Sequence, residues 1–271
     1  MEGRKLKNIA LLILVVTNLC LLTFVLQREL QDQYYSWQAR ENAIQLLKER
    51  GVDLKEEQVP DQDGLLPQIV ERDLEREGIL ASQILGDEVQ TENRGAGVYR
   101  YFNVSGSLQF HSDGTFSGEF SPGMFPVGEQ PAEDCLALLE RIGFEGTLIE
   151  ETEHAMVFQQ SWDEIPIYNQ QVTLEVNNEC VTAMRSGRRL IGTPQEDTGR
   201  STVTAATALI EAYNGINALG YVCSRIDSIT PGYLSSTSLT GVMFLTPVWR
   251  IVTDTGSYQL DMVTGELTRM A

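Results

Sequence analysis

The sequence predicts an α+β protein: one N-terminal transmembrane helix, followed by units of antiparallel sheet with helices packed on one face. Three observations favour this class. An uncharged apolar run occupies residues 9–26. Farther along, helical apolar spacing alternates three times with short strands joined at turn dipeptides. Within the strands apolar residues recur at every second position, as at Val172, Leu174 and Val176, which indicates one buried and one solvated sheet face.

The apolar run has the length of a membrane-spanning helix. At about 1.5 Å per residue, residues 9–26 span about 27 Å, roughly the thickness of the hydrocarbon core. A cleaved signal peptide is the alternative, but the run is longer than usual for one and no Ala-x-Ala-like site follows it. Basic residues at Arg4, Lys5 and Lys7 predict that residues 1–8 form a cytoplasmic tail. We therefore expect a single-pass cell-membrane protein with an extracellular C-terminal domain.

One face of this predicted helix carries an amide. Asn18 lies near its middle, and spacings of three and four residues place it in a stripe with Leu11, Val15, Leu22 and Val25. An amide in hydrocarbon seeks a hydrogen-bond partner, so the stripe is a candidate contact with another transmembrane helix. The alternative is an amide that is simply tolerated in an otherwise apolar helix.

Composition and cysteine usage exclude some classes of function. With 38 acidic against 20 basic residues, the net charge is −18, which argues against a nucleic-acid partner. Outside the membrane run lie Cys135, Cys180 and Cys223, an odd number without C-x-x-C spacing, so one disulfide and three buried thiols both stay open. Neither His111 nor His154 stands at ligand spacing from a cysteine, and we expect no metal and no cofactor.

The outer part divides into three predicted segments. Residues 27–64 form a juxtamembrane helix over 27–50, a short extended piece before Pro60 and an ordinary turn at 61–64. The first α+β unit, 65–125, has a helix at 66–85 and strands at 98–104, 107–112 and 115–120. The C-terminal region, 126–271, holds two helix-plus-sheet units, with helices at 132–142 and 202–219. Their strands are predicted at 146–151, 154–161, 167–176, 179–185, 224–236, 241–253, 257–262 and 266–270.

Chemistry-bearing residues are sparse. We find no metalloprotease, nucleophile-elbow, phosphate-loop or dinucleotide-binding motif. A pairing of Cys135 with His154 is conceivable, but Cys135 lies on an apolar helix face and is better explained by burial. Carboxylates are numerous around one hairpin, which an acidic surface accounts for. We therefore expect that the protein is not an enzyme.

Arg185, Arg188 and Arg189 form the one basic cluster of the acidic outer part. Guanidinium groups match carboxylates and phosphates, so these residues are a candidate contact with an acidic partner. Internal pairing with neighbouring acids of the same sheet is the alternative.

Several short motifs, taken in their order, carry a family resemblance. They are residues 162–169 (WDEIPIYN), 172–176 (VTLEV), 186–190 (SGRRL), 247–251 (PVWRI) and 258–266 (YQLDMVTGE). With the N-terminal membrane helix, they make the chain similar to the YycH/YycI family, and its length is closer to YycI. The resemblance implies PepSY-like units and a regulatory protein of a two-component system, anchored outside the cytoplasmic membrane of a Gram-positive-type bacterium.

The resemblance also implies partners. They are a sensor histidine kinase of the WalK/YycG type, contacted through the membrane helix, a second YycH/YycI family member, and membrane lipid. The stripe around Asn18 is then the candidate kinase contact. A different class of function stays open: an extracytoplasmic PepSY-like module that binds a cell-wall component or a protease, with the helix only an anchor.

Overall fold

The computed structural model describes residues 2–60 and 65–270, so the turn predicted at 61–64 lies outside the described residues. The side chains of residues 2–13, 25, 26, 28–30, 32 and 33 also lie outside them. The helices are α1 Glu2–Glu49, the short 3₁₀ helix η1 Glu56–Gln58, α2 Leu74–Leu85, α3 Pro131–Glu140 and α4 Ala205–Ala218. The strands are β1 Gln68–Val70, β2 Gln90–Gly95, β3 Val98–Asn103, β4 Gly106–Phe110, β5 Thr115–Phe120, β6 Gly146–Glu151, β7 Ala155–Trp162, β8 Ile165–Asn177, β9 Cys180–Arg188, β10 Pro194–Glu196, β11 Ile226–Thr237, β12 Met243–Thr253, β13 Gly256–Asp261 and β14 Leu267–Arg269.

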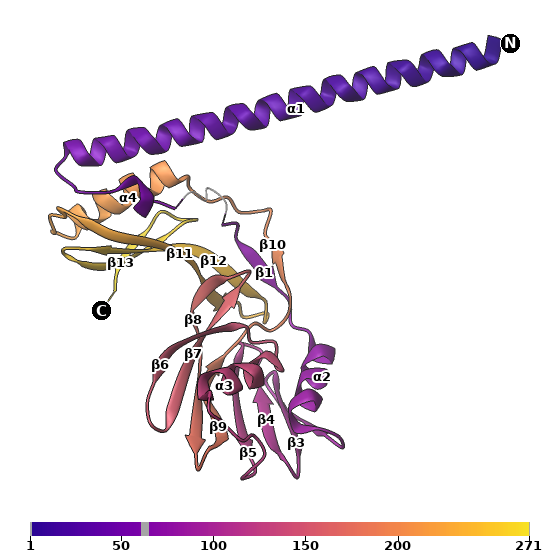
Figure 1. The fold of residues 1–271 in the computed structure, drawn as a ribbon, viewed down its shortest axis with the longest axis vertical. Coiled ribbons are helices and arrows are strands. Elements are labelled where there is room, and N and C mark those ends of the chain that lie inside the picture. Colours follow the sequence, from indigo (N-terminus) through magenta and orange to yellow (C-terminus); the bar gives the residue numbers. More distant parts are fainter. Residues whose placement is uncertain (1, 61–64, 271) are drawn as a thin grey trace.

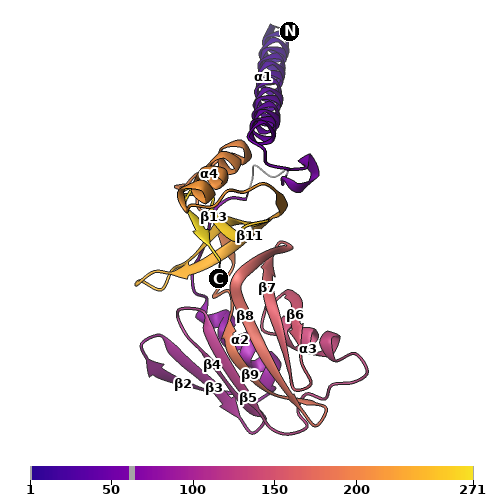
Figure 2. The same ribbon diagram turned by 90° about the vertical axis from the view of Figure 1, so that its left-hand side faces the viewer.

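The strands form two antiparallel regions joined at one point. In the described part of the chain, the sheet path runs β10-β1-β12-β11-β8-β9-β5-β4-β3-β2, with β13–β14 beside β12 and β6–β7 beside β8. The two regions meet where β8 and β11 pair in parallel at Ile167 and Tyr233. A small core around Val70, Leu190 and Met243 fills this junction. Figures 1 and 2 show the two regions stacked end to end.

One region is built from β2 to β9, with α2 and α3 packed into its core. Asp73 begins α2 by accepting a hydrogen bond from the amide of Arg76, and Gly86 ends it in a conformation with positive φ. Pro131 begins α3 at the position where its missing N–H costs nothing. The core holds large apolar side chains from both helices and the sheet, among them Ile84, Leu85, Phe110, Leu139, Phe144 and Phe158.

The other region is built from β11 to β14, with β1 and β10 at one edge. Helix α4 covers it, starting at Thr204, whose side chain accepts from the amide of Thr207. The last turns of α1 lie against α4 and share its core, which is centred on Trp249 and Tyr258. In Figure 1, α1 runs across α4 and projects well beyond the rest of the molecule.

The structure confirms most predicted elements. The strands predicted at 98–104, 107–112 and 115–120 are β3, β4 and β5, and those between 146 and 185 are β6 to β9. The helices predicted at 132–142 and 202–219 are α3 and α4, and the helix predicted at 27–50 is the distal half of α1.

Other predictions are corrected. The helix predicted over 66–85 is wrong in its first part, because Gln68–Val70 is strand β1 and α2 begins only at Leu74. The partners of β1 are β12 and β10, which lie far along the chain. Strand β2 was missed altogether, since every residue in it is exposed and it has no apolar alternation.

Among the described residues, none of the helices is both long enough and apolar enough to cross a bilayer. Within the segment predicted to span the membrane, the side chains of residues 9–13, 25 and 26 lie outside the description.

Candidate functional site

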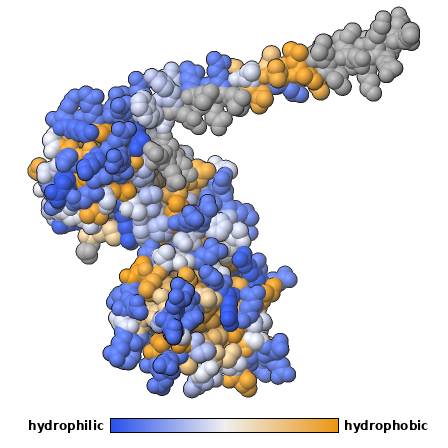
Figure 3. Space-filling view, in the orientation of Figure 1, coloured by the Kyte–Doolittle hydropathy of each residue, from blue (hydrophilic) through white to orange (hydrophobic). Residues whose placement is uncertain are grey.

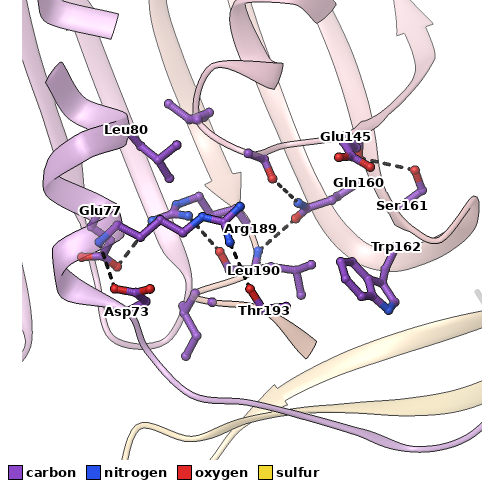
Figure 4. A pocket seen from close by; sticks show the side chains of 15 residues that line it. Asp73, Glu77, Leu80, Glu145, Gln160, Ser161, Trp162, Arg189, Leu190 and Thr193 are labelled. Carbon is purple, nitrogen blue, oxygen red and sulfur yellow. Dashed lines mark hydrogen bonds and ion pairs between the residues drawn. The ribbon is translucent and has the colours of Figure 1, made fainter. Parts of the chain in front are cut away.

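A buried ion-pair network connects α2 with the end of β9. Glu77, whose side chain is 1 % exposed, receives two hydrogen bonds from the guanidinium of Arg72, at 3.0 and 2.9 Å. A second guanidinium, that of Arg189, lies 3.4 Å from Oε1 of the same carboxylate. One carboxylate thus pairs with two arginines in the interior. Figure 4 shows Glu77 and Arg189, two members of this network.

Local structure holds each member of the network. Glu77 faces inward one turn after Asp73, the residue that caps α2, and its amide donates to the Asp73 carbonyl. Arg189 follows a bulge in β9, and its amide donates to the carbonyl of Gly114. Gly114 has φ +85°, and a Cβ there would lie 2.6 Å from the Arg189 carbonyl oxygen. The guanidinium of Arg189 also stacks over the Phe110 ring, 4.4 Å from its centroid.

The surroundings of Arg189 disfavour its charge. Its pKa is lowered to about 10, chiefly by burial and also by the nearby cations Arg72 and Arg76, while Glu77 is the one carboxylate that raises it appreciably. Its Nη1 donates to the Leu190 carbonyl at 2.9 Å. Its Nη2 makes no hydrogen bond within the described part of the chain.

A cavity of about 70 Å³ opens beside this network. Its floor consists of buried side chains, including Glu77, Arg189 and Gln160. The Gln160 amide is held in place, since it donates to the Gly143 carbonyl and accepts from the Leu190 amide. The rim is solvent-exposed or half-buried and includes Asp73, Arg76, Glu145, Ser161, Trp162 and Thr193.

The structure separates the three arginines of the predicted basic cluster. Arg185 is exposed and pairs with Glu119 at 3.0 Å and Glu175 at 3.5 Å, the internal pairing considered from the sequence. Arg188 is half-buried, while Arg189 is only 5 % exposed and belongs to the network with Glu77. A contact of this cluster with an acidic partner stays a prediction.

Sequence reasoning missed Arg72, Arg76 and Glu77. A signal was present for Glu77, because it precedes Leu80 by three residues and Ile84 by seven, on the apolar face of α2. A carboxylate on a buried helix face needs a cationic partner. Nothing in the spacing shows that the partner is Arg189, more than 100 residues away.

The predicted membrane stripe is described only in part. Val15, Asn18 and Leu22 are exposed along α1, and Leu11 and Val25 lie outside the described side chains. Their contact with another helix stays a prediction. Figure 3 shows apolar side chains gathered on this stretch of α1.

At its other end, α1 is fastened to the body of the protein. Ala43, Ile44 and Leu47 are buried in the core that contains α4. Nη2 of Arg40 donates to the carbonyls of Val59, at 2.7 Å, and Glu56, at 3.1 Å. The C-terminal part of α1 is therefore packed against α4 and hydrogen-bonded to the segment that follows it.

The thiol considered as a nucleophile is buried. Burial, and then Asp134 and Glu151, raise the pKa of Cys135 to about 11, so little thiolate exists near neutral pH. His154, its conceivable partner, is exposed. No group of three or more His, Cys, Asp or Glu in the described residues is arranged to hold a metal ion.

Comparison with solved structures finds distant likenesses. The crystal structure of an uncharacterized protein from Eubacterium rectale ATCC 33656 is 10 % identical, with a TM-score of 0.42, over 81 % of this chain and 89 % of that one. The YpeB C-terminal domain of Bacillus megaterium is 11 % identical, with a TM-score of 0.35, over 74 % of this chain and 99 % of that one. No curated protein sequence matches the chain.

A protein-family model identifies the part of the chain that includes β6 to β13. Residues 143–264 match the model described as YycI protein. These residues contain Arg189 of the buried network and Gln160 of the adjoining cavity, together with all of α4. The resemblance predicted from the sequence is thereby confirmed for this region: residues 143–264 are similar to the YycI family.

Proposed function

We propose that this protein is a membrane-anchored, extracytoplasmic regulator of a sensor histidine kinase of the WalK/YycG type. The YycI domain supports this proposal, since the family is regulatory and non-catalytic. In the proposed arrangement residues 1–8 are cytoplasmic, residues 9–26 span the cell membrane, and the C-terminal domain lies outside. The kinase, and with it a second YycH/YycI family member, contacts the membrane helix around Asn18.

The proposed anchor is supported by its sequence and by the exposure of its apolar side chains. Residues 9–26 carry no charge. The apolar side chains described between Leu14 and Phe24 are each at least half exposed. A helix that is apolar on all sides needs an apolar environment, which a bilayer supplies.

The continuity of α1 is the observation that carries the proposal. This helix extends over 48 residues, about 72 Å, without interruption, and Leu47 near its end is 1 % exposed in the core with α4. A rotation or shift of the outer domain is therefore transmitted to the face that carries Asn18. The same coupling lets a membrane partner respond to the state of the outer domain.

Changing the phase of α1 tests this coupling. One alanine inserted after Gln31 rotates the proximal part of the helix by about 100° relative to the docked end. Seven inserted alanines rotate it by about 700°, within about 20° of two full turns. We expect the single insertion to alter kinase output, measured with a promoter reporter, and the seven-residue insertion to stay close to wild type. Equal output from all three proteins, at equal membrane levels, would contradict the proposal.

A helix replacement separates this function from the alternative. When residues 9–26 are replaced by an unrelated membrane helix, a regulator acting through helix contact loses its effect on the kinase. An outer binding module that uses the helix only as an anchor keeps its function. Photocrosslinking from position 18 in native membranes then identifies the contact: capture of a histidine kinase or of a second family member supports the proposal, and capture of lipid alone opposes it.

A further inference from the structure

The buried network contains more positive than negative charge. Arg72 and Arg189 share one carboxylate, that of Glu77, which leaves one excess positive charge in the interior. Arg76 lies at the mouth of the cavity and adds a second cation. Burying a charge without a counter-charge is costly, so this arrangement favours an additional anion.

The two other carboxylates that line the cavity, those of Asp73 and Glu145, are exposed at its rim, where water and salt screen their charge more than that of the buried network. Oδ1 of Asp73 accepts from the Arg76 amide at 2.9 Å and caps α2. Glu145 is exposed on the opposite rim and forms no ion pair with any of these arginines among the described residues. Besides burial, Arg72 and Arg76 lower the pKa of Arg189, and Glu77 and Tyr101 raise it, so Glu77 is the one carboxylate that acts appreciably on this guanidinium.

Hydrogen-bond donors are also left over. Nη2 of Arg189 is buried and lies 3.4 Å from Oε1 of Glu77, an ion-pair contact, but makes no hydrogen bond in the described part of the chain. The guanidinium of Arg76 donates from Nη1 to the Thr193 hydroxyl at 3.0 Å and forms no ion pair in that part of the chain. Arginine forks are suited to the oxygens of carboxylates and phosphates.

From this charge excess, these donors and the adjoining cavity, we propose that a small free oxyanion, a carboxylate or phosphate group, binds in the cavity between Arg76 and Arg189. A cavity of about 70 Å³ holds one such group, since a single water needs about 10–15 Å³. Exposed rim residues let the anion enter from solvent. This site is separate from the kinase contact proposed above, because no residue of α1 lines the cavity.

Trp162 on the rim offers a direct readout. The full-length protein in non-ionic detergent is titrated with sodium phosphate and, separately, sodium acetate, with chloride keeping the ionic strength constant. We expect a saturable change in tryptophan fluorescence that disappears in Trp162→Phe, and a rise in melting temperature with the anion that binds. Phosphate and acetate distinguish the two oxyanion chemistries, and a response to either supports the site.

Three variants test the assignment. Arg76→Gln and Arg189→Lys each remove donors to the anion, and we expect the dissociation constant to rise by about tenfold or more. Arg185→Gln, an exposed arginine outside the cavity, is the matched control and should bind as wild type does. If Arg189→Lys does not fold, Arg76→Gln decides, because its side chain is exposed. Absence of saturation, unchanged binding in Arg76→Gln, or an equal loss in Arg185→Gln overturns the proposal.

Discussion

Replacing Glu77 with glutamine keeps the shape of the side chain and removes its charge. The carboxylate is 1 % exposed, and its partners Arg72 and Arg189 have side chains 12 % and 6 % exposed. Removing one member of a buried ion pair leaves uncompensated charge and costs about 3–5 kcal/mol. Here two guanidiniums lose the same partner, so we expect the cost to reach this range. That is a large part of the roughly 5–15 kcal/mol by which folded proteins are stable.

Urea unfolding followed by circular dichroism measures the effect, and the midpoint should fall by about 1 M or more. The matched control is Glu119→Gln, because the pair of Glu119 with Arg185 is exposed on both sides and pairs of this kind contribute about 0–1 kcal/mol. In a double-mutant cycle with Arg189→Met, we expect a coupling of about 1 kcal/mol or more. A loss in Glu77→Gln no larger than in Glu119→Gln would refute the reasoning.

Three further predictions concern other parts of the molecule. Leu47→Ala should cost about 2–5 kcal/mol and loosen α1 from α4, seen as faster hydrogen exchange in α4, whereas the exposed control Lys48→Ala should change neither. Iodoacetamide at neutral pH should modify Cys180, which is half-buried, well before Cys223. The reason is that burial, and then Asp254, raise the pKa of the Cys223 thiol to about 11. Mass spectrometry gives the order of modification, and equal rates for the two cysteines would contradict the prediction. The Ser224 hydroxyl and nearby amides lower the pKa of Asp254, so its contribution to stability is present above the ordinary aspartate pKa and is lost as pH falls through the lowered one. Urea midpoints against pH should show this slope, and Asp254→Asn should flatten it; an identical slope in the variant would exclude the residue as its source.

Elements with strong local signals were predictable. The β4–β5 hairpin follows from Asp113-Gly114 between two alternating stretches, and α3 follows from Pro131 before an apolar face. Strand β1 is different, because its three residues become a strand only through pairing with β12 and β10. Strand β2 lies at the edge of the sheet and is exposed throughout. Because neither of its faces is buried, its sequence lacks the alternation of apolar and polar residues that predicts a strand.

The candidate site shows the same division. Arg185, Arg188 and Arg189 look like one cluster in the sequence, yet the bulge in β9 and the end of the strand direct them differently. Arg185 meets Glu119 and Glu175 on the sheet surface, and Arg189 turns into the interior. Charge and spacing predict that such residues find partners, but which partners they find depends on strand register.

The amino-acid sequence by itself determined the α+β class, most of the helices and hairpins, the acidic character and the YycI resemblance, because apolar periodicity, turn residues and charge act over a few neighbouring positions. Only the tertiary structure decided that α1 ends against α4, that β8 and β11 join the two sheet regions, and that Arg72, Glu77 and Arg189 form one buried network beside a cavity. These arrangements depend on contacts between residues far apart in the chain. These contacts contribute to the free energy of folding only when burial brings the groups together and removes the water between them.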